Sequence, residues 1–366
     1  MSRANDRDAA LETLMLALEA ELTLVSDEGR VAFLRARPHE GLRKFGDRLV
    51  CMQNFKPAAD ELEGAGWKNA DALEGKYTLV LLLPERQKEL TLADFAQGME
   101  LLADDGVLVV SLHNDWGAKR FEGHLAELAG EVEMLSKNHC RAFWARKTPS
   151  LDMDMLKEWR ALGEVTRVVG DRFWSRRGLF SWDEIDDGSK LLIAHLPETI
   201  RGHVADLGAG WGFISDFLVR NRPGIKKLDV YEADQVALDC AKINLGSVPT
   251  DVTVEYHWAD VTLGIGPPRF DCIVMNAPFH EGRQPDPLLG VKFIAAALGA
   301  LRVGGQLWLV ANRHLPYERH LAEAFAEFAI VIQEGPFKVL RAVRGEIVRE
   351  DSIKGTYSKR DYYKSL

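Results

Sequence analysis

Short apolar runs alternate with longer amphipathic segments along most of this chain. The runs have the length of buried strands, and the segments between them are long enough for helices. In the second half this pattern predicts strands at 204–207, 227–231, 252–257, 270–277 and 306–310, with helices at 213–220 and 293–301. Alternating strands and helices of this kind are typical of α/β domains, whose parallel sheets are built from right-handed crossovers.

The first half repeats part of this pattern. The apolar run from Tyr77 to Pro84 is similar to the one from Phe270 to Ala277, and each is followed by a helix, a turn and another buried run. In the first half these elements are predicted at 95–102, 104–106 and 107–111. The separation of about 195 residues is far too long for a solenoid repeat, and it predicts two copies of one α/β domain.

The two halves differ where a ligand would bind. In the second half a strand leads into the glycine-rich turn Asp206-Leu-Gly208-Ala-Gly210-Trp-Gly212. The corresponding strand of the first half, expected at 22–26, leads into residues 27–30, which contain one glycine. Where the second half has Asn276, the first has Leu83. The first half is therefore predicted to be a degenerate copy that has kept the fold and lost the site.

Length and composition agree with two globular domains. A chain of 366 residues suits two domains at roughly 150 residues each. We expect the boundary between Thr148 and Arg167, and we divide the chain between residues 155 and 156. No apolar run approaches the roughly 20 residues that span a bilayer, and no signal peptide is recognisable. The four cysteines are far apart, which argues against a zinc site or a disulfide framework and indicates a reducing, cytoplasmic compartment.

The charge pattern is mixed. The net charge of −9 argues against a protein that is broadly coated by nucleic acid. Locally, however, residues 338–366 contain eight Lys or Arg against four acids. A second basic cluster comprises Arg167, Arg172, Arg176 and Arg177. Both segments are equally compatible with ordinary solvated surface and with contacts to RNA phosphates.

Three acids stand at the ends of successive strands in the second half. Asp206 ends the first strand, Glu232 follows the strand at 227–231, and Asp260 follows the strand at 252–257. Each acid alone would be explained equally well as a helix cap or a solvated loop residue. Because ligands bind at the carboxyl ends of strands in open α/β sheets, all three together indicate one site. Glu232 can accept hydrogen bonds from ribose hydroxyls, and Asp260 can accept from an adenine amino group.

The spacing of the glycines in this turn distinguishes two classes of nucleotide-binding site. Glycines allow close approach of the backbone to a ligand, but Phe213 replaces the third glycine of the dinucleotide-binding pattern G-x-G-x-x-G. The carboxylate of Asp206 also suits the zwitterionic methionine moiety of S-adenosylmethionine better than a pyrophosphate. We therefore expect this cofactor and no metal. The predicted cofactor site comprises Asp206, Gly208, Ala209, Gly210, Glu232, Ala233, Asp260, Val261 and Asn276.

The fourth strand ends in Asn276-Ala277-Pro278-Phe279-His280. This run resembles the Asn-Pro-Pro-Phe/Tyr motif of class I methyltransferases that methylate exocyclic or amide nitrogens. It is most similar to the ribosomal RNA guanine-N2 methyltransferases, both the C type that acts on small-subunit rRNA and the related G type that acts on large-subunit rRNA. The segments 178–192, with Asp186, Gly188 and Ser189, and 312–317 and 337–342 also resemble this family, so the likeness covers most of the second half.

The resemblance implies two tandem Rossmann-like class I methyltransferase domains. The degenerate domain, 1–155, would capture RNA or support the structure, and the domain 156–366 would transfer a methyl group to the exocyclic N2 of a guanosine in ribosomal RNA, most directly 16S RNA. Asn276 Oδ1 and the Ala277 carbonyl would accept the two N–H bonds of the amine. Pro278 would shape the turn, Phe279 would stack on the extruded base, and His280 is assigned a structural role.

Ala277 departs from the family motif, which has proline there. The backbone carbonyl is retained while the fixed φ of proline is lost, so activity is expected to persist. The sequence is also compatible with other methyl acceptors, namely guanine in large-subunit rRNA, adenine N6, protein glutamine and free metabolites. It is compatible, too, with a ribosome assembly factor that binds the cofactor without catalysing methyl transfer. The second domain and the basic C-terminal segment favour a macromolecular substrate, and the run 276–279 favours an enzyme. No membrane association is expected, and a monomer is compatible with the sequence.

Overall fold

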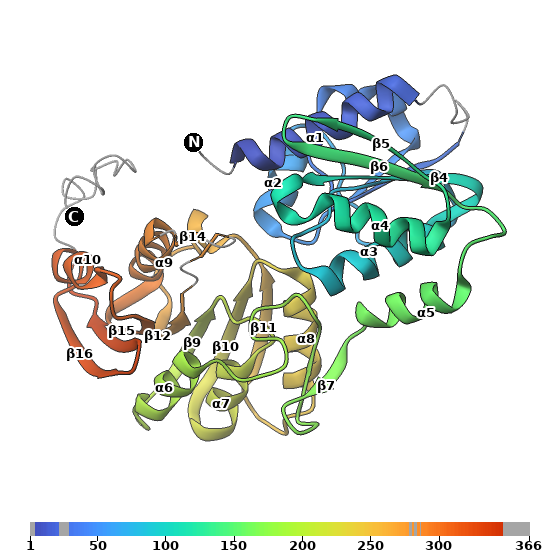
Figure 1. The fold of residues 1–366 in the computed structure, drawn as a ribbon. Helices are drawn as coiled ribbons and strands as arrows, with labels where there is room; N and C mark the ends of the chain where they lie inside the picture. Colours follow the sequence, from blue (N-terminus) through green and yellow to red (C-terminus); the bar gives the residue numbers. More distant parts are fainter. Residues whose placement is uncertain (1–3, 22–28, 278–279, 282–283, 286, 347–366) are drawn as a thin grey trace. The chain divides into compact units, whose positions relative to one another are not determined.

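The computed structural model describes residues 4–21, 29–277, 280–281, 284–285 and 287–346. The chain divides into two compact units (Figure 1). The first comprises Met1–Thr166 and Arg176–Gly178, and the second comprises Arg167–Ser175 and Leu179–Leu366. Among the described helices, none combines the length and the apolar character that crossing a bilayer requires.

The structure divides the chain after Thr166, which lies inside the expected interval between Thr148 and Arg167. The exact split between residues 155 and 156 falls inside α5 (Met153–Leu162) and is corrected. Leu156 and Trp159 of this helix are buried in the core of the first unit. The Trp159 ring lies 6.4 Å from the ring of Phe95. Because an amphipathic helix stays with the unit that buries its apolar face, the main division of the chain follows Thr166.

The first unit contains a six-stranded sheet in the order β2-β1-β3-β4-β6-β5. The first four strands in this order are parallel, and the last two form an antiparallel pair. The strands are β1 (Val31–Leu34), β2 (Leu49–Met52), β3 (Tyr77–Leu82), β4 (Leu102–His113), β5 (Val132–Lys137) and β6 (Cys140–Arg146). Alongside α5, the helices are α1 (Ala4–Glu21), α2 (Lys56–Gly64), α3 (Lys88–Leu101) and α4 (Ala118–Ala129), with 3-10 segments η2 (Glu40–Arg48) and η3 (Asn114–Trp116).

Both faces of this sheet are buried, which explains its continuous apolar strands. In β3, Leu79 and Leu81 point to the face covered by α1 and α2, whereas Val80 and Leu82 point to the face covered by α3 and α4. Successive side chains of a strand point to opposite faces, so a strand covered on both sides must be apolar throughout. The expected strand 22–26 lies outside the described residues, and the strand at the corresponding place in this sheet is β1.

The second unit contains a seven-stranded sheet in the order β11-β10-β9-β12-β15-β17-β16. Its strands are β9 (Arg201–Leu207), β10 (Gly224–Glu232), β11 (Thr253–Trp258), β12 (Phe270–Asn276), β15 (Leu301–Asn312), β16 (Glu327–Glu334) and β17 (Phe337–Val343). Two short pairs lie outside it: β7 (Thr166–Val168) with β8 (Phe173–Ser175), and β13 (His280–Glu281) with β14 (Gln284–Pro285).

Helices cover the second sheet on both faces as well. Val204, Val230 and Val274 point toward α6 (Asp187–His195), α7 (Phe213–Asn221) and α8 (Gln235–Gly246). Ala205 and Met275 point to the other face, toward α9 (Pro287–Ala300), α10 (Tyr317–Ala324) and the 3-10 segment η4 (Val261–Leu263). The strands and helices predicted in this half are all present, mostly longer by a few residues.

The two sheets share one strand order once β11 is set aside. This common topology confirms the α/β prediction and the similarity between the halves. The prediction of parallel sheets holds for the strands joined by helical crossovers. In the second sheet, however, β17 pairs antiparallel with both β15 and β16. In the first sheet, β6 likewise pairs antiparallel with both β4 and β5. A short connection such as the one between β16 and β17 permits only an antiparallel neighbour, because a parallel one needs a crossover.

Candidate active site

The glycine turn joins β9 to α7. Gly208 N and Ala209 N both donate to the Tyr231 carbonyl, at 2.9 and 3.0 Å, which fixes the turn against the end of β10. Gly210 has a φ of +56°, in the left-handed region that favours glycine, and a Cβ built there would meet no atom within 4 Å. The turn therefore presents open backbone at a strand end, which suits close approach of a ligand.

Glu232 lies beside this turn at the end of β10. Its Oε2 accepts a hydrogen bond from Gly210 N at 2.7 Å, and its Oε1 accepts from Ala233 N at 2.7 Å and Asp234 N at 2.9 Å. Burial raises the pKa of Glu232, and the hydrogen bonds from these N–H groups act in the opposite direction. The structure thus places the predicted ribose acceptor directly against the glycine turn, held by backbone donors.

Asp206 is completely buried under the first turn of α7. Its Oδ2 accepts from the Ser215 hydroxyl at 2.7 Å, whereas its Oδ1 has no hydrogen-bond partner among the described residues. Burial, reinforced by the nearby charge of Glu232 and opposed by the bond from Ser215, raises the pKa of Asp206 to about 7. An unused oxygen on a buried carboxylate fits a cationic ligand such as an ammonium group. This observation agrees with the cofactor expected from the sequence.

The third acid, Asp260, follows β11 and begins η4. Its Oδ1 accepts from Thr262 N at 2.8 Å and from the Thr262 hydroxyl at 2.6 Å. The neighbouring Val261 is buried, and Trp258 Nε1 donates to the Ala233 carbonyl at 2.8 Å, which ties the loops after β10 and β11 together. The three acids therefore stand at the ends of β9, β10 and β11, which are adjacent in the sheet.

Asn276 ends β12, the neighbour of β9 on the other side. Its side-chain nitrogen donates to Asp186 Oδ2 at 2.8 Å and to the Ser189 hydroxyl at 2.9 Å. Ala277 is buried in the core. Pro278 and Phe279, the other two expected acceptor-site residues, lie outside the described residues, and the backbone of His280 lies in β13.

Asp186 and Ser189 both contact Asn276, although in the sequence they stood out only as part of the family-like segment 178–192 and were given no role. In the structure Asp186 caps α6 and accepts from Ser189 N at 2.7 Å. A helix cap is a common local feature. Only the fold shows that this one adjoins a residue 90 positions away along the chain.

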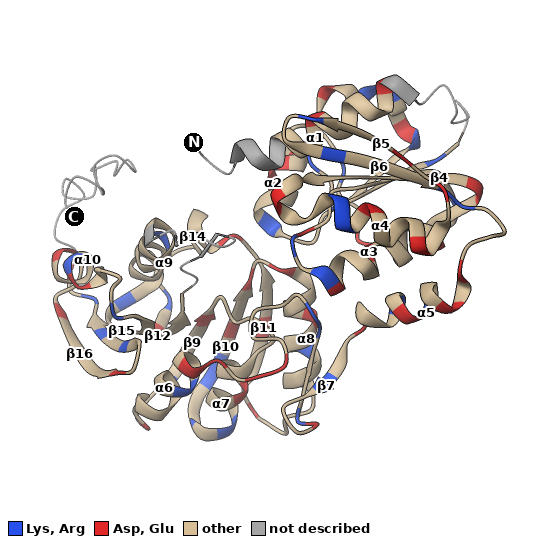
Figure 2. Ribbon diagram, viewed as in Figure 1, with Lys and Arg blue, Asp and Glu red and all other residues tan. Residues whose placement is uncertain are grey.

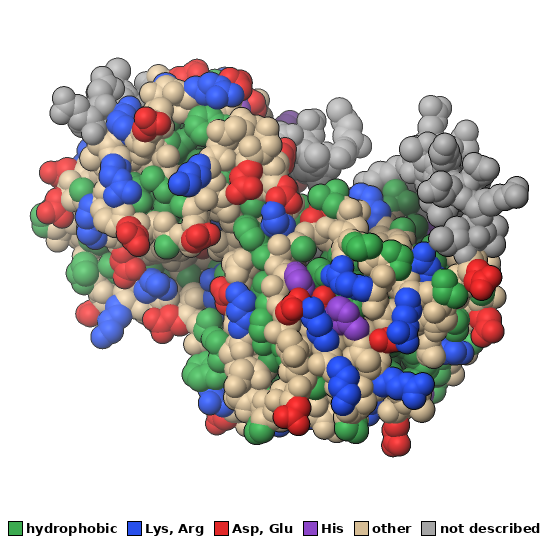
Figure 3. Space-filling view, turned by 180° about the vertical axis from the view of Figure 1, so that it is seen from behind, with side chains coloured by type: hydrophobic (Ala, Val, Ile, Leu, Met, Phe, Trp, Pro, Cys, Tyr) green, Lys and Arg blue, Asp and Glu red, His purple; other side chains and the backbone are tan. Residues whose placement is uncertain are grey.

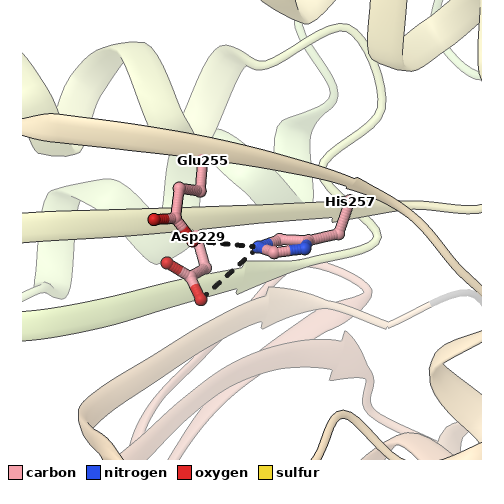
Figure 4. Close-up of side chains that lie close together, drawn as sticks. All are labelled: Asp229, Glu255 and His257. Carbon is pink, nitrogen blue, oxygen red and sulfur yellow. Dashed lines mark ion pairs between the residues drawn. The ribbon is translucent and has the colours of Figure 1, made fainter.

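A separate titratable cluster surrounds Asp229 in the middle of β10. Figure 4 shows Asp229, Glu255 and His257 close enough together to ligate a metal ion. However, Lys227 Nζ lies 2.7 Å from Glu255 Oε1, and Arg269 lies 3.3 Å from Asp229 Oδ2. These cations balance the carboxylates, so the cluster is explained as an ion-pair network.

The first sheet lacks these site residues at the matching positions. Leu34 lies opposite Leu82 in the first sheet, as Leu207 lies opposite Met275 in the second. In this register Phe33 corresponds to Asp206 and Arg35 corresponds to Gly208. Gln53 corresponds to Glu232, and Leu83 corresponds to Asn276. The nitrogen of Ala36 still donates to the Met52 carbonyl at 3.0 Å, as Ala209 donates to Tyr231. The first unit thus keeps the backbone of the turn without its chemistry.

Residues 170–341 match the methyltransferase small domain family. The ribosomal RNA small subunit methyltransferase C of Yersinia pseudotuberculosis (strain PB1/+) is 30% identical over 288 residues, which cover 78% of this chain and 80% of that protein. The protein of the same name from Yersinia pestis (strain Pestoides F) matches with the same identity and coverage.

Among solved structures, this chain is similar to the T. thermophilus 16S rRNA N2 G1207 methyltransferase (RsmC) in complex with AdoMet and guanosine. The TM-score is 0.73 at 25% identity, and the match covers 92% of both chains. The likeness therefore includes both units as well as the strand ends described above. The chain belongs to the ribosomal RNA small subunit methyltransferase C family.

Proposed function

We propose that this chain transfers a methyl group from S-adenosylmethionine to the exocyclic N2 amine of a guanosine in 16S ribosomal RNA. The observation that carries the proposal is the position of Asn276. It ends the strand next to β9, beside the glycine turn, and its side-chain nitrogen already donates hydrogen bonds to Asp186 and Ser189. The names of the curated relatives and of the T. thermophilus structure, with its AdoMet and guanosine, support the same reaction.

The cofactor would be held by the strand ends of the second unit. Asp206 would face the cationic methionine moiety through its unused oxygen, and the turn Gly208–Gly210, with Ala209, would approach it through the backbone. Glu232, flanked by Ala233, would bind the ribose hydroxyls, and Asp260 with Val261 would border the adenine. When bound, S-adenosylmethionine supplies an activated methyl group, so the protein needs no metal and no covalent nucleophile.

The residues of the acceptor side would orient the amine. The lone pair of an aromatic amine is delocalised into the ring, so the amine is a poor nucleophile. Asn276 Oδ1 and the Ala277 carbonyl would accept its two N–H bonds, which directs the lone pair toward the methyl group and stabilises positive charge on nitrogen as it develops. The excess proton then passes to water. Pro278 would shape this turn, and Phe279 would stack on the base.

RNA binding would involve both units, with the first unit capturing RNA or supporting the structure. Figures 2 and 3 show Lys and Arg interspersed with Asp and Glu over the described parts of both units. Part of the basic cluster seen in the sequence serves internal contacts: Arg172 Nη2 lies 2.6 Å from Asp216, and Arg167 lies over the Trp174 ring at 4.6 Å. All four cysteines are buried thiols, which fits action in the reducing cytoplasm.

The test is methylation of 16S RNA and of small ribosomal subunits by wild-type protein and by Asn276→Ala, followed by nucleoside mass spectrometry. We expect N2-methylguanosine from the wild type. The variant should lose on the order of 100-fold in rate while its cofactor affinity changes by no more than a few-fold, as for loss of a preorganised transition-state acceptor. An Asn276→Ala variant with the wild-type rate would contradict the proposed role, and binding without turnover by the wild type would favour an assembly factor.

A further inference from the structure

The first turn of α6 is built around the side chain of Asn276. Asp186 Oδ2 and the Ser189 hydroxyl accept its two amide hydrogens, at 2.8 and 2.9 Å. The same Asp186 oxygen accepts from Ser189 N at 2.7 Å, so the helix cap and the contact to Asn276 share one atom.

The chemistry of these groups fixes the orientation of the amide. An ionised carboxylate can only accept hydrogen bonds, so the nitrogen of Asn276, and not its oxygen, must face Asp186. With both amide hydrogens bound on this side, Oδ1 is directed to the other side of the amide group. That atom is the one that the proposed function assigns to the target amine.

We propose that Asp186 and Ser189 are positioning residues for methyl transfer, which act through Asn276. They hold the amide in the orientation that presents Oδ1 to the substrate. The negative charge of Asp186 also polarises the amide, which makes Oδ1 a stronger acceptor for positive charge on the target nitrogen. This inference rests on the proposed function of Asn276 and deepens it.

Packing holds the positioning turn in place. A Cβ at Gly188 would come within 3.1 Å of the Phe337 ring and 3.0 Å of Asp186 Oδ2, so only glycine fits there without a shift. Phe337 begins β17, and residues 186–189, 276 and 337 therefore meet although they are far apart in the sequence. Asp187, the next residue along the chain, has a side chain that is 78% exposed and pairs with Lys190. It provides a matched control.

The experiment compares Asp186→Asn and Ser189→Ala with the control Asp187→Asn in steady-state methylation of small ribosomal subunits. Asparagine is also a good helix cap, so Asp186→Asn should preserve α6 while removing the charge. We expect kcat to fall roughly tenfold for Asp186→Asn and about threefold for Ser189→Ala, since hydrogen bonds to charged groups are the stronger ones. The KM for cofactor should stay within twofold in all three variants, and Asp187→Asn should retain the wild-type kcat.

A double-mutant cycle separates positioning from general support. If Asp186 acts through Asn276, Asp186→Asn should cost no further activity in an Asn276→Ala background, whereas a merely structural role would give additive losses. Additive losses, or a kcat for Asp186→Asn equal to that of Asp187→Asn, would overturn the inference while leaving the role of Asn276 intact. A wild-type rate for Asn276→Ala alone would instead refute the proposed function on which the inference rests.

Discussion

At the scale of single residues, we expect the glycine turn to be the most sensitive part of the proposed cofactor site. Gly210 has a φ of +56°, and its nitrogen donates to Glu232 at 2.7 Å. An aspartate there would adopt a left-handed conformation at a cost of about 1–2 kcal/mol and add a carboxylate beside Glu232. We expect Gly210→Asp to weaken S-adenosylmethionine binding by a factor on the order of 100 or more, because the ligand would lose its close contacts with the backbone of the turn. Isothermal titration calorimetry measures this affinity.

Gly123→Asp serves as the control for this substitution. Gly123 lies in α4 of the first unit, where an added Cβ would meet no atom within 4 Å. This variant should bind the cofactor as the wild type does. Near-native affinity of a folded Gly210→Asp protein would show that the cofactor does not bind at this turn.

Single residues also show how far sequence reasoning reached into the site. Asp206, Glu232 and Asp260 were predictable because each follows an apolar run, and strand ends converge in a parallel sheet. The contacts of Asn276 with Asp186 and Ser189 were not predictable, although both residues lie in the segment 178–192 that resembles the family. Asp186 precedes Asn276 by 90 residues, and helix capping explains an aspartate there without any contact to the site.

At the scale of elements, β10 carries a buried charge that the neighbouring strands neutralise. Asp229 has a side chain only 1% exposed and lies against His203 of β9, His257 of β11, Lys227 and Arg269. Burial alone would raise the pKa of Asp229. The contact with His257 at 3.5 Å and the hydrogen bond with His203, together with the charges of His203 and Lys227, outweigh burial and hold the pKa of Asp229 well below its usual range.

This network predicts acid-sensitive stability of the second unit. A carboxyl group whose pKa is depressed by folding stabilises the fold fully above its unfolded pKa, about 4, and this contribution is lost as the pH falls further. Asp229→Asn should therefore lower the free energy of unfolding by about 2 kcal/mol at pH 7, because it removes the carboxylate to which the half-buried side chains around it are bound. It should also flatten the dependence of stability on pH below 4.

Urea denaturation between pH 3 and 7 measures this effect, with Asp251→Asn, a substitution at an exposed position, as the control. The control should unfold like the wild type at every pH. Equal stability of Asp229→Asn and the wild type at pH 7 would mean that the network contributes nothing to folding.

The positions of most elements could be predicted from the sequence, but their directions could not. The apolar runs at 270–277 and 306–310 identified β12 and the middle of β15, because burial on both faces produces such runs. The antiparallel pairing of β16 and β17 was missed. An apolar run can mark a strand, but it does not give the direction of that strand. β16 contains such a run, residues 328–332, although most of its residues are exposed.

At the scale of the whole molecule, two units share one topology, and among the described residues only the second unit has those proposed to bind the cofactor. Phe33, Arg35 and Gln53 stand in the first sheet where Asp206, Gly208 and Glu232 stand in the second. We expect calorimetric titration of the full chain with S-adenosylmethionine to give one site per chain. A stoichiometry of two would show that the first unit binds the cofactor despite these replacements.

Arg35 has a consequence for protein engineering. It stands where the second unit has Gly208 and keeps a positive φ of 55°, while its guanidinium binds Asp94 at 2.8 Å and Glu85 at 2.9 Å. Asp94 is buried, so replacing Arg35 with glycine to rebuild a turn would leave that carboxylate without its cation. This would lower the free energy of unfolding by about 3–5 kcal/mol. A bivalent enzyme with two working cofactor sites therefore cannot be made by restoring the turn alone. Such a design would also have to replace Asp94, which would otherwise lose its cation, and Phe33 and Gln53, which stand where the second unit has the carboxylates of Asp206 and Glu232.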